Sequence, residues 1–488
     1  MLRGGWTDGG ADLKIAIDMA TSAMFLIVLV ASARADRWDA LREGVEAWHA
    51  LQFDDDFAVN VGDESGTLFR WESPGFSSAT TRMAGASLSK WPAAIMISGL
   101  VNDGIMSYDD LASKHLSWWA TDDEDPRSRV TLRHLLSFTS GYHGDGFASP
   151  FCARHVSTRE QFMACAISLY NHSNAYGAEP GTIWAYLTCH LQFAGAMAVA
   201  ASGKAIDELF QTYLYTPFNM TSTTWTPTHN PQLAVGITTT ANDFEQLLHR
   251  LLTYAVLPKS ILDEMETDYS QPPCTPSGDG WFGHYGMGHW WECIGYGTPS
   301  KPYERLPLPP VCMANHIQAG PGLYGYYPLI DRSGGGGLAG PTRPRLYFQV
   351  ALQESTRLSG IPEYLRVLAK PVVDLILNGS DPRTADRSNL LRQGGALLQR
   401  DLDDIRSALS NCLCLRALGH KGEPYAGDHA PLYGLDSSPY LPRSLSLSLP
   451  RNCLLCLHSA CVYVCVCVRG QPSRQTSPRT CPGSHGAS

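Results

Sequence analysis

A serine and a lysine three residues apart stand at the head of an apolar, periodic segment of this chain. The serine is Ser87, the lysine is Lys90, and the apolar run extends from Ala93 to Leu100. The period predicts a helix, and Pro92 fits only its first turn, where backbone N–H groups have no partner in any case. Ser87 and Lys90 then lie on one face, one turn apart. The segment therefore predicts a helix whose N-terminus presents a hydroxyl beside an amine.

This pair of residue types suits nucleophilic catalysis. A serine hydroxyl attacks efficiently only when a nearby base removes its proton. In a partly dry site Lys90 would hold its proton less tightly and could act on Ser87 as that base, while the helix dipole would favour negative charge nearby. Two fixed positions in four residues also arise by chance in 488 residues, so the tetrapeptide alone assigns no function.

The order of strand-like and helical segments predicts an α+β fold. A β-hairpin is expected from Phe57–Gly62 and Thr67–Trp71, and helical periodicity dominates from Ser87 to Tyr254. Strand-like segments return at 323–330 and 346–352, followed by a helix at 362–377. Strands at both ends of a helical block are typical of an α+β mixed architecture.

Three further motifs follow Ser87-x-x-Lys90 in order. They are Thr131–Tyr142 (TLRHLLSFTSGY), Pro180–Thr188 (PGTIWAYLT) and Pro217–Thr223 (PFNMTST). Together the four motifs resemble the serine β-lactamase-related hydrolases, which include class C β-lactamases, penicillin-binding-protein-like peptidases and esterases. The resemblance covers about residues 50 to 376. It implies a β-lactamase/transpeptidase-like fold, in which helices flank an antiparallel sheet and an all-helical insertion forms one wall of the active-site groove.

The resemblance also assigns proton-transfer residues. Tyr186 matches the tyrosine of the family's Y-x-N motif, which approaches the nucleophile and the lysine and moves protons during deacylation. Thr188 stands where the family has asparagine. Threonine offers one hydroxyl in place of an amide's acceptor and two donors, which weakens recognition of β-lactam or peptide amides.

The third family motif, Lys- or His-x-Gly on a strand edge, is degenerate in this chain. Alignment on the following strand places Gly320 at the basic position and Gly322 at the motif glycine, both as substrate-binding positions. The residue after the glycine donates its N–H to the oxyanion, and here that residue is Leu323. The alternative register, Gln318–Gly320, would give this role to Pro321, which has no N–H.

The N-terminus predicts secretion. Met24–Val30 is an apolar run, and the Ala33-x-Ala35 pattern before Asp36 is typical of a signal-peptidase site. A short membrane anchor is the alternative, but the run is too brief to span a bilayer comfortably. Residues 1–35 are therefore expected to be a signal peptide, 36–378 the hydrolase domain, and 379–488 a low-complexity, disordered tail.

An oxidising compartment would permit disulfides among the six cysteines of the hydrolase segment. Cys152 and Cys165 are the expected pair, because they bracket one loop and helix. The alternative is that some of these cysteines are buried as small apolar side chains.

Composition and missing motifs exclude several other functions. The net charge of −9 and the absence of basic runs give no nucleic-acid surface. No G-x-S-x-G elbow and no H-x-H-x-D or H-E-x-x-H pattern occurs, so neither an α/β-hydrolase nor a zinc enzyme is expected. His134 and His190 are expected to be structural. No cofactor, metal or stable membrane span is implied, and the oligomeric state stays open.

The sequence thus predicts a secreted serine hydrolase that cleaves an ester or amide through an acyl-enzyme, with a carboxylesterase-like preference. Ser87 attacks, Lys90 and Tyr186 move protons, and the N–H groups of Ser87 and Leu323 hold the oxyanion. Two alternatives stay open. One is a β-lactamase or D-amino-acid peptidase, and the other is an inactive homologue that acts as a binding module, for which the lost basic residue at Gly320 argues.

Overall fold

The structure is a computed structural model of the chain, and the chain divides into two compact units, Met1–Gly422 and Glu423–Ser488. In the second unit the described strands β12 (Leu457–His458) and β13 (Cys461–Val462) pair antiparallel. The described residues are 36–51, 56–143, 159–172, 176–226, 230–270, 275–276, 284–292, 317–333, 345–352, 360–379, 457–458 and 461–462.

A six-stranded antiparallel sheet in the order β2-β1-β11-β10-β9-β8 organises the first unit. Its strands are β1 (Phe57–Asp63), β2 (Gly66–Glu72), β8 (Trp290–Glu292), β9 (Ile317–Ala319), β10 (Tyr326–Asp331) and β11 (Leu346–Leu352). Phe57 of β1 lies opposite Leu352 of β11, so strands almost 300 residues apart in sequence pair at the centre of the sheet.

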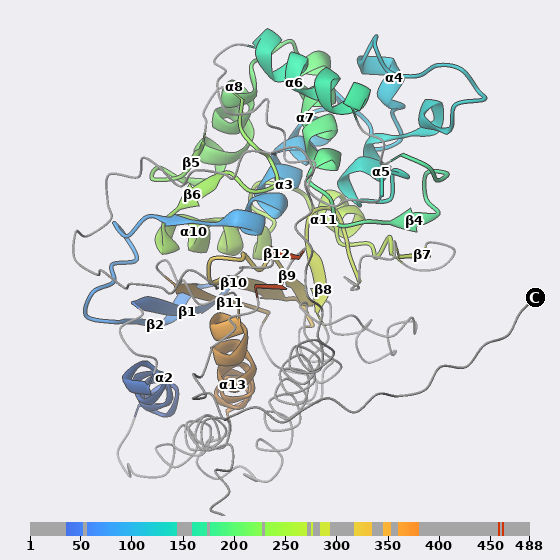
Figure 1. Ribbon diagram of the computed structural model, residues 1–488. Helices are drawn as coiled ribbons and strands as arrows, with labels where there is room; N and C mark the ends of the chain where they lie inside the picture. Colours follow the sequence, from blue (N-terminus) through green and yellow to red (C-terminus); the bar gives the residue numbers. More distant parts are fainter. Residues whose placement is uncertain are drawn as a thin grey trace, which may run out of the picture. The chain divides into compact units, whose positions relative to one another are not determined.

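Alternating side chains of β1 separate two hydrophobic cores. Phe57, Val59 and Val61 pack into the core with the helices α2 (Asp39–Leu51) and α13 (Gly360–Leu377). Ala58 points to the opposite face and joins the core formed by the helical part of the chain. Figure 1 shows this layering, with α2 and α13 below the sheet and α10 (Ala241–Leu252) above it. Because successive side chains of a strand point to opposite faces of the sheet, β1 contributes residues to both cores.

The helical part lies between the hairpin and the returning strands in sequence. Its two central helices, α3 (Lys90–Asn102) and α7 (Cys189–Ser202), are buried on nearly all sides, which is typical of a helix that is apolar all round. The surrounding helices are α4 (Ala112–His115), α5 (Leu132–Leu136), α6 (Arg159–His172), α8 (Ile206–Phe210), α9 (Thr216–Phe218) and α11 (Lys259–Met265). The short helices are η1 (Ala86–Ser89), η2 (Pro126–Arg129) and η4 (Gln211–Tyr215).

Short strands connect the helical part to the sheet. The small strands are β3 (Met83–Ala84), β4 (Ile183–Trp184), β5 (Thr224–Trp225), β6 (Ile237–Thr239) and β7 (Thr275–Pro276). Strand β6 pairs with both β3 and β5, which anchors the chain immediately before Ser87. This small sheet fixes where α3 begins.

The predicted α+β fold, an antiparallel sheet flanked by helices with a large helical insertion, is confirmed. One boundary was wrong. The segment 323–330 was expected to be a strand throughout, but β10 begins only at Tyr326. A turn precedes it, because Gly325 has a φ of +101° and its N–H donates to the carbonyl of Gly322 at 3.1 Å.

Several sequence predictions fall outside the described residues. The signal-like segment 1–35, Cys152 and most of 379–488 are among them, so secretion, the Cys152–Cys165 pairing and the nature of the tail stay predictions. Cys165 itself is buried on α6. Within the described ranges, no helix combines the length and the apolar character that a membrane crossing requires.

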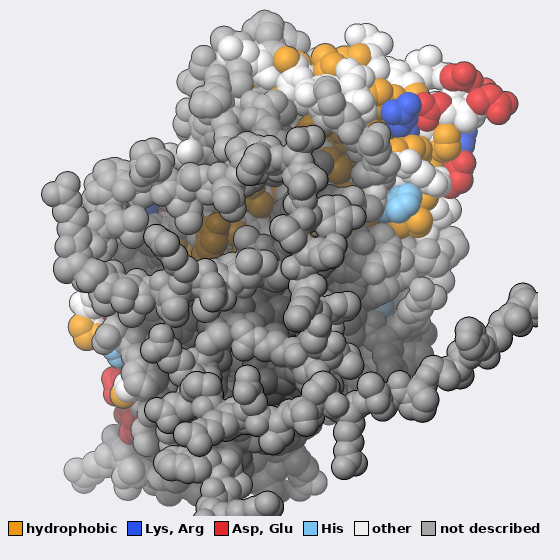
Figure 2. All heavy atoms as spheres, viewed as in Figure 1, with side chains coloured by type: hydrophobic (Ala, Val, Ile, Leu, Met, Phe, Trp, Pro, Cys, Tyr) orange, Lys and Arg blue, Asp and Glu red, His pale blue; other side chains and the backbone are white. Residues whose placement is uncertain are grey.

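Exposed charges gather at one corner of the helical part. Figure 2 shows acidic side chains at this corner, on the same side as α4 in Figure 1, and Asp122, Asp123 and Glu124 are the exposed acidic residues of the loop that follows α4.

Over the residues that the structure describes, no group of three or more His, Cys, Asp or Glu side chains could hold a metal ion.

Candidate active site

The backbone is held under strain immediately before Ser87. Ala86 has a φ of +46°, a region that side chains with a Cβ rarely occupy. The hydroxyl of Ser89 donates to the carbonyl of Ala86 at 2.6 Å and accepts from the N–H of Ile237 at 2.9 Å. Gly85 donates to the carbonyl of Ile237 at 2.8 Å. These bonds tie η1 to β6 and maintain the conformation that presents Ser87.

Lys90 lies directly beside Ser87. Nζ of Lys90 is 2.9 Å from Oγ of Ser87 and donates to the carbonyl oxygen of Ala234 at 3.0 Å. The Lys90 side chain is buried, with 2% of its surface exposed, whereas Ser87 is partly exposed. Burial disfavours the charged amine and lowers the pKa of Lys90 to about 7. The partly exposed hydroxyl of Ser87 therefore has the amine of Lys90, which is neutral in part at pH 7, within hydrogen-bond distance.

Tyr186 completes the cluster from the segment between β4 and α7. The centroid of its ring lies 4.5 Å from Nζ of Lys90. Burial raises the pKa of the Tyr186 phenol to about 12, while hydrogen bonds with the side chains of Ser87 and Trp290 act in the opposite direction. The structure thus brings Ser87, Lys90 and Tyr186 together, as the sequence predicted for their geometry.

Aromatic side chains hold Tyr186 in place. Phe138 and Tyr285 meet its ring edge-on at centroid distances of 5.7 and 6.0 Å, and Trp290 lies 5.2 Å away. Phe138 has a φ of +64°, and its carbonyl accepts from the N–H of Ala185 at 3.0 Å. The turn after α5 therefore fixes the residue next to Tyr186.

The two histidines of the motifs are structural, as expected. His190 is buried, and its ring nitrogens contact Oγ of Ser140 at 2.9 Å and the carbonyl of Ala185 at 3.0 Å. His134 completes a capping box with Thr131 at the start of α5. Burial lowers the pKa of His190 to about 3 and that of His134 to about 4, so both rings are neutral at pH 7.

Thr188 occupies a helix end. It is the N-cap residue of α7, two residues after Tyr186, and its side chain makes no capping hydrogen bond.

The two glycines of the third motif pack against the segment that carries Ser87. A Cβ on Gly320 would lie 2.9 Å from Cε3 of Trp91, and a Cβ on Gly322 would lie 2.2 Å from the carbonyl oxygen of Gly85. Trp91 is buried, so it cannot move aside easily. A side chain at Gly320 would therefore begin against the indole ring of Trp91, and Leu323 follows directly on the glycine that touches Gly85.

Several residues that shape the site were not predicted from the sequence. Ser89, Ala234 and Trp91 act through contacts between segments that are distant in the chain. Ser89 lies inside the S-x-x-K motif, but nothing in the motif indicates that its hydroxyl reaches β6.

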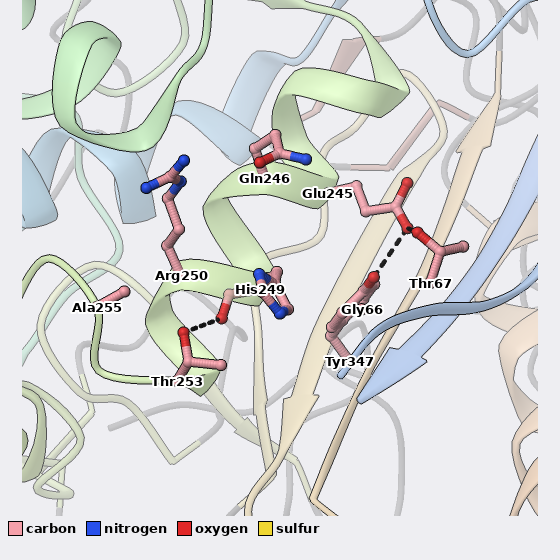
Figure 3. Close-up of a pocket in the computed structure, with 9 residues that line it drawn as sticks. All are labelled: Gly66, Thr67, Glu245, Gln246, His249, Arg250, Thr253, Ala255 and Tyr347. Carbon is pink, nitrogen blue, oxygen red and sulfur yellow. Dashed lines mark hydrogen bonds between the residues drawn. The ribbon is translucent and has the colours of Figure 1, made fainter. Parts of the chain in front are cut away.

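A separate cavity of about 340 Å³ lies between α10 and the β1–β2 hairpin (Figure 3). In Figure 3, Thr67 and Tyr347 point toward the carboxylate of Glu245, donating at 2.6 and 2.8 Å. Asn60 donates to the same carboxylate at 2.9 Å, and Arg70 pairs with it. Glu245 is thus fully engaged in joining α10 to the sheet, and none of the residues that line the cavity belongs to the cluster around Ser87.

Comparisons with known proteins agree with this architecture. Residues 68–302 match the family model described as Beta-lactamase. A candidate beta-lactamase of Bacteroides dorei DSM 17855 is similar in structure, with a TM-score of 0.54 and 22% identity, over 70% of this chain and 99% of that chain. A penicillin-binding protein homologue from Pyrococcus abyssi has a TM-score of 0.50 and 17% identity, over 71% of this chain and 78% of that chain. At these identities the two structures show the fold that this chain shares with them, and the match to the Beta-lactamase family model extends over residues 68–302.

Proposed function

We propose that this domain hydrolyses small, neutral carboxylic esters through a covalent acyl-enzyme on Ser87. The observation that supports this most is the 2.9 Å distance between Nζ of Lys90 and Oγ of Ser87, in a site where Lys90 is buried. A hydroxyl with a neutral amine at this distance has the base that a serine nucleophile needs.

Lys90 is the base in this proposal, and Tyr186 is a proton donor. With a pKa of about 7, Lys90 is neutral in a large fraction of molecules at neutral pH. With a pKa of about 12, the Tyr186 phenol retains its proton under the same conditions. The opposite effects of burial on an amine and on a phenol thus give the two groups complementary roles.

Acylation begins when Lys90 takes the proton of Ser87 and Oγ bonds to the ester carbonyl carbon. The N–H groups of Ser87 and Leu323 donate to the oxyanion that forms. When the bond to the alcohol oxygen breaks, Tyr186 protonates the leaving alkoxide and recovers a proton from the Lys90 ammonium. Water then attacks the acyl-enzyme, its proton returns through Lys90 to Oγ of Ser87, and the carboxylic acid leaves.

Two features favour neutral esters over β-lactams and D-amino-acid peptides. Those substrates carry a carboxylate and an amide that need partners, and an unpaired buried charge or amide is costly. Trp91 fills the place beside Gly320 where a cation would bind the carboxylate. Thr188 offers fewer hydrogen-bonding groups to the amide than asparagine would.

The test compares kcat/KM for p-nitrophenyl butyrate with kcat/KM for a chromogenic cephalosporin. We expect the ester to react faster and Ser87→Ala to lose turnover of both. Faster hydrolysis of the cephalosporin would contradict the ester preference and favour the β-lactamase alternative. No turnover of either, from folded protein, would favour an inactive homologue that acts as a binding module.

A further inference from the structure

An apolar turn lies beside the nucleophile. Gly322 accepts from the N–H of Gly325 at 3.1 Å and donates to the carbonyl of Tyr326 at 2.7 Å, which closes a four-residue turn with Leu323 and Tyr324 at its centre. Central turn positions usually hold Gly, Asn, Asp, Pro or Ser, whose backbone or side-chain properties suit a turn. A leucine and a tyrosine together at these positions need another explanation.

Both side chains are exposed to solvent. Leu323 exposes 43% of its surface and Tyr324 exposes 48%. Among the residues that the structure describes, the other exposed large hydrophobic side chains are Ile105 and Leu111. Single exposed apolar residues are common on proteins, but here two adjacent residues of one turn are exposed together.

The position of this turn is fixed relative to Ser87. A Cβ on Gly322 would meet the carbonyl oxygen of Gly85 at 2.2 Å and Cβ of Leu88 at 3.1 Å, so the two backbones are in direct contact. Leu88 is the residue after Ser87. Since neighbouring Cα atoms are about 3.8 Å apart, the side chain of Leu323 starts within one residue of this contact.

We propose that Leu323 and Tyr324 bind the apolar acyl chain of the substrate ester and thereby select for acyl-chain length. This inference rests on the proposed function. In that mechanism the N–H of Leu323 holds the oxyanion, and the alcohol leaves toward Tyr186. The acyl chain is the remaining substituent of the carbonyl carbon, and we place it against the side chains of this turn. Covering the two exposed side chains with methylene groups removes apolar surface from water on both partners.

The experiment measures kcat/KM for p-nitrophenyl acetate, butyrate and hexanoate, which share one leaving group. Each buried methylene is worth up to roughly fourfold in kcat/KM, so the wild type should favour hexanoate over acetate. Leu323→Ser and Tyr324→Ser should each lower the hexanoate-to-acetate ratio by about fivefold or more. Tyr324→Phe keeps the ring and should retain the wild-type ratio.

Ile105→Ser is the matched control, because Ile105 exposes 38% of its surface and follows the far end of α3, about 20 Å along the helix from Lys90. This variant should keep the wild-type ratio. The folding of every variant is checked by circular dichroism and thermal unfolding. If one serine variant does not fold, the other together with Tyr324→Phe still decides the outcome.

An unchanged ratio in the serine variants, or an equal fall in Ile105→Ser, would overturn the proposal. A second comparison uses ethyl acetate and hexyl acetate, which differ only in the alcohol. If the serine variants change the preference between these two esters and not the preference for acyl-chain length, the turn binds the alcohol and the proposal is overturned. Ester turnover with a flat chain-length profile removes only this inference. Absence of turnover of every ester removes the proposed function as well.

Discussion

Burial decides the chemistry of the candidate site at the scale of single residues. Lys90 and Tyr186 lie in the same dry cluster, yet the pKa of the lysine falls to about 7 and that of the tyrosine rises to about 12. The same desolvation that makes the amine available as a base keeps the phenol protonated. In the proposed mechanism, one environment therefore prepares two opposite proton-transfer roles.

The pH dependence of activity follows from the pKa of Lys90. We expect kcat/KM for p-nitrophenyl butyrate to rise with pH through an inflection near 7, because only the neutral amine can accept the proton of Ser87. Lys90→Arg should lose at least a hundredfold in kcat/KM, since a guanidinium stays charged. An inflection near pH 4 to 5 would point to a carboxylate base and contradict this assignment.

The same shift makes a prediction for stability. In the unfolded chain Lys90 has its ordinary pKa of 10.5, so between about pH 7 and 10.5 the unfolded state binds more protons and wild-type stability rises with pH. Lys90→Met lacks this contribution. The unfolding free energy of wild type minus that of Lys90→Met should therefore increase by roughly 1.4 kcal/mol for each unit that the pH rises across this window, as measured by urea unfolding. A constant difference between pH 7 and 10 would show that Lys90 is not desolvated.

Ser89 is expected to position the nucleophile. Ser89→Ala removes the bond to the carbonyl of Ala86 and leaves the buried N–H of Ile237 without its partner, at a cost of about 1–3 kcal/mol. With Ala86 less constrained, kcat should fall about tenfold or more while KM changes little. Ser202→Ala removes a similar serine-to-carbonyl bond, to Ala198 on α7, and should lower stability without this loss of kcat. Equal kinetics in both variants would contradict a positioning role.

Local motifs predicted part of the site, and tertiary contacts decided the rest. Ser87 and Lys90 could be paired from sequence because one helical turn separates them. The contact that a side chain at Gly320 would make with Trp91 could not be predicted, because it depends on how the segment after β9 lies against Trp91 of α3. The link between Ser89 and Ile237 joins residues 148 positions apart, and no local pattern records it.

At the scale of elements, the hairpin, the helix after Ser87 and the C-terminal helix followed from periodicity. The expected strand at 323–330 was wrong at its start, because apolar residues at 323 and 324 fit a strand pattern as well as an exposed turn. The positive φ of Gly325 and the contact of Gly322 with Gly85 set the turn instead. Exposure of an apolar residue is a tertiary property, so the sequence pattern alone could not separate the two.

Gly322 tests how closely this turn and the segment before Ser87 must approach. Gly322→Ala would place a Cβ 2.2 Å from the carbonyl oxygen of Gly85, so the turn must move and the N–H of Leu323 with it. We expect a loss of several kcal/mol in stability and at least a hundredfold in kcat/KM. The control is Gly203→Ala at the end of α7, where a Cβ meets nothing within 4 Å and only the φ of +73° is strained. Gly322→Ala with wild-type kinetics would show that the turn does not contribute to the site.

At the scale of the whole molecule, the six-stranded sheet joins early and late segments of the first unit. Strand β1 pairs with β11, and α2 packs with α13 over the same face. Periodicity alone gives no strand order, because these pairings join segments almost 300 residues apart. The order of the family-like motifs indicated the fold, and the structure supplied the register.

The pairing of β1 with β11 and the packing of α2 against α13 predict where the chain can be shortened. The candidate site residues all precede Asn378, so a chain that ends at Gly379 should fold cooperatively and retain most of its esterase kcat/KM. A chain that ends at Leu352 lacks α13, which buries Val373 and Ala369 against the sheet, and should fail to fold. Thermal unfolding and kcat/KM of both truncations are the measurements. Loss of activity in the longer one, with folding intact, would place a functional contribution beyond Gly379.

Covalent labelling with a fluorophosphonate tests the central claim most directly. An activated Ser87 should displace fluoride and form an Oγ–phosphorus bond, which peptide mapping by mass spectrometry assigns to one residue. We expect a single label on Ser87 in the wild type, none in Ser87→Ala, and much slower labelling in Lys90→Met. A label on another residue that persists in Ser87→Ala, or no label on folded wild-type protein, would contradict the account of Ser87 as a nucleophile activated by Lys90.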